Sequence, residues 1–248
     1  MDLGLTEAQE ILKTSVADFV QREYDKNTLL ALERSPTGIT PELLRKVAAL
    51  GWLGVVIPEA YGGEGRSLTD AAVLFEELGR GPVPGPLFAS AVLGALTVQH
   101  GGSEAQKRAI LPQVAGGQWI LSVAVTEADY GWRPEQLHMH ASLGHGHYVL
   151  NGTKLFVYDA KAATHLISAV RISPASNGAS RGLTRLMVEA STPCVSVRTV
   201  PGWMGLPKDT DVTGATRPNI EHHFVGEARA DLGEVLNQDV DLVEAVQR

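Results

Sequence analysis

The chain has 248 residues, 44% of them hydrophobic and 20% charged, with a formal net charge of -7. This composition is typical of a globular protein with one large or two modest domains, and it excludes an intrinsically disordered chain. The acidic balance and the lack of a long Lys/Arg run argue against a nucleic-acid partner.

Cysteine content and the amino terminus indicate the compartment. The single cysteine, Cys194, cannot form an internal disulfide or a Cys-rich zinc site. The first residues carry acids and no apolar stretch of signal-peptide length, and no run of about 18 apolar residues follows. We therefore expect a cytoplasmic chain with no membrane-spanning segment.

The first half of the chain has helical spacing with clear start signals. Thr6 and Gln9 match a capping box, and Thr40 followed by Pro41 places an N-cap before a first-turn proline. Helices are predicted to begin after Thr6, Thr40, Ser67 and Ser103, and a further helix is predicted over residues 87–100. The amino-terminal half is therefore expected to be all-helical.

From Trp119 onwards the apolar residues alternate with a period of two, which predicts strands. The strand-like runs cover residues 119–126, 137–143, 148–158, 165–170, 183–188, 195–200 and 219–225. Helices followed by strands, without alternation of the two, indicate an α+β chain whose two parts meet near residue 119.

Two motifs suggest chemistry that their surroundings do not support. Residues 178–182 match G-x-S-x-G, but a loop precedes them and a β pattern follows, whereas a nucleophile elbow needs a strand and then a helix. Four histidines, His138, His140, His145 and His147, flank a predicted turn. Since no carboxylate or cysteine at ligand spacing accompanies them, we interpret them as exposed hairpin residues rather than a metal site.

A set of ordered segments resembles the acyl-CoA dehydrogenase family. The order and spacing of these segments match the family over nearly the whole chain. They are Pro58-Glu59-Ala60-Tyr61-Gly62-Gly63, Phe75-Glu76-Glu77-Leu78-Gly79-Arg80, Gly101 to Lys107, Leu111-Pro112, Val125-Thr126-Glu127 and Tyr148 to Lys154. The resemblance implies a helical amino-terminal domain at 1–118, a β-barrel or sandwich middle domain at 119–236, and the start of a truncated carboxy-terminal helix at 237–248.

The resemblance also implies a reaction. In this family a Glu carboxylate removes the α-proton of an acyl-CoA thioester while the β-hydrogen leaves as hydride to FAD, in a cleft closed by a carboxy-terminal helical bundle. That bundle carries the base, and the 248 residues stop where it would begin. We therefore expect a flavoprotein subunit or fragment that is inactive alone, and no catalytic residue is assigned within it.

Six residues correspond to the family's cofactor segments: Val125, Thr126, Gly131, Trp132, Phe156 and Tyr158. Trp132 and Tyr158 stand where the family has small hydroxyl residues. The bulk of these two rings is expected to weaken FAD binding. The alternative interpretation of Trp132, Phe156 and Tyr158 is that they belong to the β-domain core or to an interface.

Three functions follow from these observations. The first is an acyl-CoA dehydrogenase-like subunit with acyl-CoA as substrate, assembled as a homo-oligomer or as a heteromer with a chain that supplies the helical bundle. The second is a binding or assembly protein of the same fold that has lost FAD. The third is a flavin-dependent monooxygenase of the same fold. Bound flavin separates the first from the second, and reduction of that flavin by acyl-CoA separates the first from the third.

Overall fold

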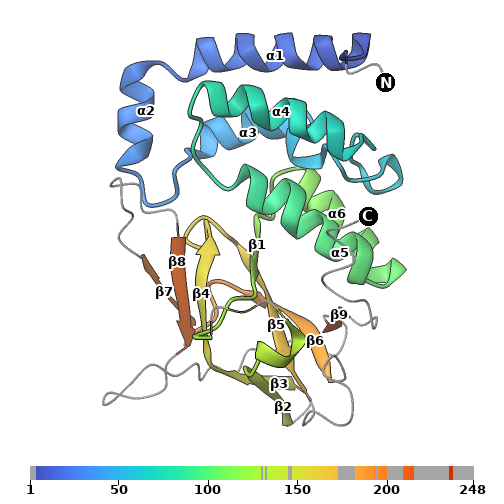
Figure 1. Cartoon of the computed structure of the whole chain (residues 1–248), viewed down its shortest axis with the longest axis vertical. Helices are drawn as coiled ribbons and strands as arrows, with labels where there is room; N and C mark the ends of the chain where they lie inside the picture. Colours follow the sequence, from blue (N-terminus) through green and yellow to red (C-terminus); the bar gives the residue numbers. More distant parts are fainter. Residues whose placement is uncertain are drawn as a thin grey trace.

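A computed structural model of the chain places a helical layer over two β-sheets (Figure 1). It describes residues 4–129, 131, 133–144, 147–172, 182–193, 195–199, 209–214 and 235–236. The helices occupy the amino-terminal part and the strands follow them, as the apolar spacing predicts.

The predicted helix starts are confirmed by the caps. The Thr6 and Ser103 side chains each form a reciprocal capping box, with Gln9 and Gln106. Thr40 accepts from the Leu43 backbone ahead of its first-turn proline. The helices are α1 (Glu7–Glu23), α2 (Lys26–Glu33), α3 (Pro41–Ala49), α4 (Leu68–Arg80), α5 (Ala95–Gly101) and α6 (Glu104–Ala115).

Two helical features differ from the prediction. Helix α2 was not predicted; it is capped by Asp25, whose side chain accepts from the Thr28 backbone. The range predicted as a helix, residues 87–100, is helical along its length, but Ala89–Gly94 form a π-helix, η3, that continues into α5. The small residues of η3 let it lie directly against the first strand, and the Leu121 amide donates to the buried Ser90 hydroxyl (3.1 Å).

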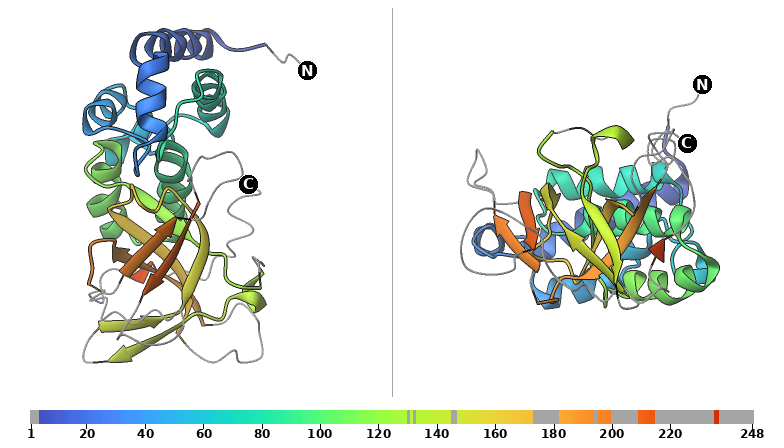
Figure 2. Two further views of the ribbon diagram at one scale, coloured as in Figure 1. Left: turned by 90° about the vertical axis from the view of Figure 1, so that its left-hand side faces the viewer. Right: turned by 90° about the horizontal axis from the view of Figure 1, so that it is seen from below.

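The strands form two sheets. The larger has the order β3-β2-β5-β6-β9, and β1 pairs in parallel with β5; the smaller has the order β4-β8-β7. The strands are β1 (Leu121–Ala124), β2 (His140–Gly144), β3 (His147–Asn151), β4 (Thr153–Tyr158), β5 (His165–Arg171), β6 (Leu183–Glu189), β7 (Val195–Thr199), β8 (Asp209–Gly214) and β9 (Val235–Leu236). Figure 2 shows the sheets below the helices from the side in its left view, and in front of the helices, seen from below, in its right view.

The long strand predicted over residues 148–158 is wrong as a single element. The chain leaves the larger sheet after Asn151 and enters the smaller one at Thr153. Gly152 lies between them, and a Cβ at this position would meet the Met139 side chain at 2.7 Å. Strand β8 was not predicted, while the strand predicted over 219–225 and the G-x-S-x-G serine, Ser180, lie outside the described residues.

The larger apolar core joins the helices to the larger sheet. It contains Val16, Phe19 and Leu111 from the helices together with Leu121, from β1, and Ile167, from β5. A second, smaller core lies within the β part. The division of the chain at residue 119 therefore stays a prediction, and the predicted segment 237–248 lies outside the described residues. Over the part of the chain that is described, no helix has the length and apolar character needed to cross a membrane.

The contact of η3 with β1 should make Gly94 sensitive to any side chain. A Cβ on Gly94 would lie 2.5 Å from the Leu121 Cβ, whereas one on the exposed helical Gly79 would meet nothing within 4 Å. We expect Gly94→Ala to lower the free energy of unfolding by about 1–3 kcal/mol through overpacking. The matched control Gly79→Ala should raise it by roughly 0.5 kcal/mol, because alanine has the higher helix propensity. Urea denaturation measures both, and equal effects would show that η3 and β1 are not in tight contact.

Candidate functional site

The two predicted cofactor segments lie against each other. Strand β4 runs beside β1 and its continuation, residues 125–127 (Figure 1). The Leu155 amide donates to the Thr126 carbonyl at 2.8 Å. Further along the strand, the Ser122 hydroxyl donates to the Tyr158 carbonyl at 2.6 Å. These bonds join β1, in the larger sheet, to β4, in the smaller one.

A buried ion pair fastens these segments together. Lys154 is 0% exposed, and its Nζ lies 2.6 Å from the Oε1 of Glu127. The same ammonium donates to the Val125 carbonyl at 3.1 Å. Burial lowers the pKa of the Lys154 ammonium from its ordinary value, while the neighbouring Glu127 carboxylate acts in the opposite direction.

Glu127 also holds the start of the next strand segment. Its carboxylate accepts from the backbone amides of His138 (2.7 Å) and Met139 (3.0 Å). It therefore receives an ammonium and two peptide donors, which is what a buried carboxylate requires. Sequence reasoning placed Glu127 among the resemblance segments without finding this role. The available signal was a lysine, Lys154, at a position where the strand pattern would bury it.

Phe156 and Tyr158 point away from the buried pair because β4 is irregular. The pairing of β4 with β8 shifts register between Lys154 and Val157, as at a β-bulge. Phe156 has φ +52°, a left-handed backbone that costs an aromatic residue on the order of 1–3 kcal/mol. As a result Lys154 and Val157 are both buried, while Phe156 is 40% and Tyr158 54% exposed.

These exposures bear on the two interpretations of the aromatic residues. Such exposed rings do not fit the core interpretation of Phe156 and Tyr158. A cofactor-binding or interface role for them stays a prediction, as does the role of Val125 and Thr126. Both of the latter are partly exposed at the point where β1 ends.

The predicted pyrophosphate segment is only partly described. Trp132 lies outside the described residues. Gly131 is packed against the Gln136 side chain, whose carboxamide would overlap a Cβ at this position. The same carboxamide accepts from the Arg133 amide at 3.4 Å, so Gln136 lies against both Gly131 and Arg133.

The histidine group gains a partner that the sequence did not indicate. The Nε2 of His138 lies 3.0 Å from the Oδ2 of Asp129, and both side chains are exposed, which agrees with the interpretation of His138 as an exposed residue. Within the ranges that the structure describes, no group of three or more His, Cys, Asp or Glu could hold a metal ion. His145 lies outside those ranges.

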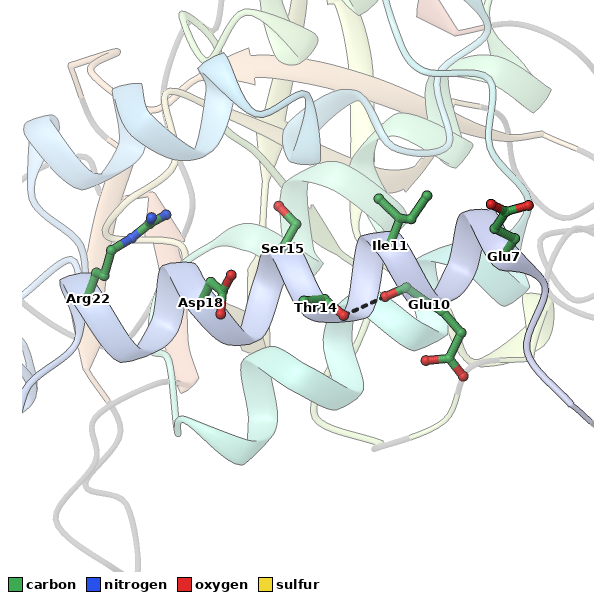
Figure 3. A pocket seen from close by; sticks show the side chains of 7 residues that line it. All are labelled: Glu7, Glu10, Ile11, Thr14, Ser15, Asp18 and Arg22. Atoms are coloured by element: carbon green, nitrogen blue, oxygen red, sulfur yellow. Dashed lines mark hydrogen bonds between the residues drawn. The ribbon is translucent and has the colours of Figure 1, made fainter.

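A surface hollow of about 500 Å³ lies elsewhere, on helix α1 (Figure 3). All seven of its lining residues come from this one helix. They include three acids, Glu7, Glu10 and Asp18, as well as Arg22 and Ile11, which is 64% exposed. None of the predicted cofactor residues contributes to it. A hollow made by one helix surface offers no converging polar groups, so it is not the candidate site.

The hydrogen-bond pattern of the buried pair predicts unequal costs for removing its two partners. Glu127→Leu takes the acceptor from the Lys154 ammonium and from two peptide amides, whereas Lys154→Met leaves Glu127 with both amides. We expect Glu127→Leu to cost about 3–5 kcal/mol in unfolding free energy, and Lys154→Met clearly less. Urea denaturation of the single and double variants gives the coupling energy. Equal costs would contradict the expected inequality, and purely additive costs would contradict the pairing.

Comparison with known proteins identifies the family to which this chain is related. Residues 6–118 match the family model "Acyl-CoA dehydrogenase, N-terminal domain", and residues 122–214 match "Acyl-CoA dehydrogenase, middle domain". Mitochondrial isovaleryl-CoA dehydrogenase of Pongo abelii is 30% identical over 192 residues, which are 77% of this chain and 45% of the relative. The chain spans about half the length of the curated relatives it matches.

Solved structures agree with this fold. Acyl-CoA dehydrogenase of Geobacillus kaustophilus superposes with a TM-score of 0.81 at 20% identity, over 100% of this chain and 62% of its own. The ChsE4-ChsE5 complex of Mycobacterium tuberculosis gives 0.80 at 24% identity, over 100% of this chain and 60% of its own. Two adjacent family domains, in the order that the helical and β parts require, account for most of the sequence. The chain therefore belongs to the acyl-CoA dehydrogenase family.

Proposed function

We propose that this chain forms the amino-terminal and middle-domain part of a flavin-dependent dehydrogenase that converts an acyl-CoA thioester into its α,β-enoyl thioester. The observation that carries the proposal is the joining of residues 125–127 to β4. Leu155 and Lys154 bond to the backbone of Thr126 and Val125, which brings the two predicted cofactor segments into one place. This arrangement is present in a chain of the acyl-CoA dehydrogenase family.

The described residues fit the ring end of FAD. Phe156 exposes aromatic surface on the outer face of β4, in the strand that bonds to the partly exposed Thr126. A flat flavin ring can stack on such side chains and accept hydrogen bonds from a hydroxyl or a peptide amide. At the pyrophosphate end, Gly131 offers its backbone with Gln136 packed on its Cβ side. When bound, FAD would supply the acceptor for the hydride that leaves the β-carbon.

Three carboxylates of the resemblance segments, Glu76, Glu77 and Glu127, are poorly suited to removing the α-proton. Glu127 is buried and already accepts three donors, from Lys154, His138 and Met139. Glu76 and Glu77 both pair with Arg80, at 2.8 and 3.0 Å, on helix α4. A general base must reach its proton at hydrogen-bond distance while it is free to accept it.

The base is therefore proposed to come from polypeptide outside these 248 residues, in the same or in another chain. A partner that closes over β4 would also cover the exposed Phe156 and Tyr158 rings. The similar ChsE4-ChsE5 structure is a complex of two named components. A heteromer or a homo-oligomer is the assembly proposed here.

Flavin binding tests the cofactor part of the proposal. We expect the chain purified alone to hold little FAD, because Trp132 and Tyr158 place large rings where the family has small hydroxyl residues. Trp132→Ser with Tyr158→Thr should raise FAD affinity, measured by quenching of flavin fluorescence. Tyr61→Thr is a matched control, since its hydroxyl bonds to Glu104 in the helical part.

An unchanged FAD titration in the double variant would remove both positions from the flavin site. Stoichiometric flavin in the unaltered chain would show instead that the two rings do not hinder binding. If no variant binds flavin, the assembly protein without FAD becomes the better account.

Turnover tests the second part of the proposal, that the catalytic base comes from polypeptide outside these 248 residues. Acyl-CoA mixed with this chain, excess FAD and an artificial electron acceptor should give no enoyl-CoA, because the base is proposed to lie outside these 248 residues. Product should form when polypeptide carrying the family's helical bundle is added, as followed by the absorbance of the enoyl thioester. Turnover by the rigorously purified 248-residue chain would place the base within it.

A further inference from the structure

We infer that the Glu127–Lys154 ion pair is a positioning device: it holds the left-handed backbone at Phe156 and so keeps the Phe156 ring on the outer face of β4. The inference rests on the proposed function only for what the ring would meet there, a flavin. Neither residue touches that ligand, and both act through the strand.

The conformation at Phe156 needs an external cause. A β-strand side chain alternates between faces, so residues 154, 156 and 158 of a regular strand would share one face. Here Lys154 and Val157 point inward, and Phe156 and Tyr158 point outward. The extra residue of the bulge, with φ +52° at Phe156, moves the residues after Lys154 to the opposite faces of β4. An aromatic residue adopts such a backbone only when its surroundings enforce it.

The enforcing contacts lie on both sides of Phe156. On the amino-terminal side, the Lys154 ammonium is bound by Glu127 and by the Val125 carbonyl, and the Leu155 amide is bound by the Thr126 carbonyl. On the carboxy-terminal side, Val157 is buried and the Tyr158 carbonyl accepts from Ser122. Residues 154–155 and 157–158 are therefore both fixed, and the irregular backbone conformation falls on Phe156, which lies between them.

Stability alone does not account for the pair. Replacing a buried ion pair by apolar residues of similar volume is often neutral or stabilising. What an apolar residue cannot do is bond to Glu127 and Val125 together, which fixes the position of residue 154 along β1. Without that bond, β4 can slip by one residue into regular alternation, which turns the Phe156 ring to the inner face.

The test compares Lys154→Met with a matched variant, Arg185→Met. Arg185 is also a buried cation of the β part, but it lies on β6 with its guanidinium against Gly101. The chain is labelled with fluorophenylalanine, and the Phe156 signal is assigned from its loss in Phe156→Leu. Hydrogen exchange of the Leu155 amide is measured on the same samples.

In Lys154→Met we expect the Phe156 fluorine signal to move, and the Leu155 amide to exchange about tenfold faster or more. In Arg185→Met both should keep their values although the protein is destabilised. Ser122→Ala removes the other anchor by deleting only one hydroxyl, and it should move the same signal by a smaller amount. This mild variant keeps the test valid if Lys154→Met does not fold.

An unchanged Phe156 signal in Lys154→Met, or an equal change in Arg185→Met, would overturn the inference. These readouts need no flavin, so they can succeed even where the proposed function fails. Titration with FAD, in the Trp132→Ser and Tyr158→Thr background that is expected to bind it, adds the functional arm: weaker binding when Lys154→Met is added, by about tenfold, supports the link to flavin. Unchanged FAD affinity together with a displaced Phe156 would overturn that link.

Discussion

One buried contact, between Lys154 and Glu127, determines how the β part of this protein is put together. A fully buried ammonium and its carboxylate are unfavourable unless every donor and acceptor is paired. Here the pairing draws in the Val125 carbonyl and the His138 and Met139 amides. Three segments far apart in sequence are thereby fixed to one another. The end of β1, the entry to β2 and the first half of β4 cannot shift independently.

The helical part supplies the rigid base for this arrangement. The Ser90 hydroxyl accepts from the Leu121 amide, and Thr164 accepts from the Ile120 amide at 2.9 Å, so β1 is held from both sides. Trp119 stacks on His165, with ring centroids 3.9 Å apart. Burial lowers the pKa of the His165 imidazole, while the Glu189 carboxylate acts in the opposite direction. A site built on β1 therefore inherits the stiffness of the main core.

Local signals in the sequence were enough for much of the fold but not for the site's geometry. Caps at Thr6, Thr40 and Ser103 are short-range features, so helix starts could be predicted from them. The break at Gly152 depends on its contact with Met139, and the bulge at Phe156 depends on anchors from β1. Such long-range contacts leave no periodic trace, and alternation alone merges β3 and β4 into one strand. The family resemblance could name the cofactor segments, but it could not show that Glu127 joins them.

The departures from ordinary strand chemistry cluster within a few residues. A buried lysine, a register shift and an aromatic residue at positive φ all occur between Lys154 and Val157. The left-handed backbone of Asp159 nearby needs less explanation, because aspartate tolerates it. Sequences agree with local rules nearly everywhere and break them where function demands a particular geometry. These departures expose the rings of Phe156 and Tyr158. The unfavourable free energy of the left-handed backbone and buried lysine in β4, and the exposed aromatic surface that could meet a ligand, therefore have the same structural origin.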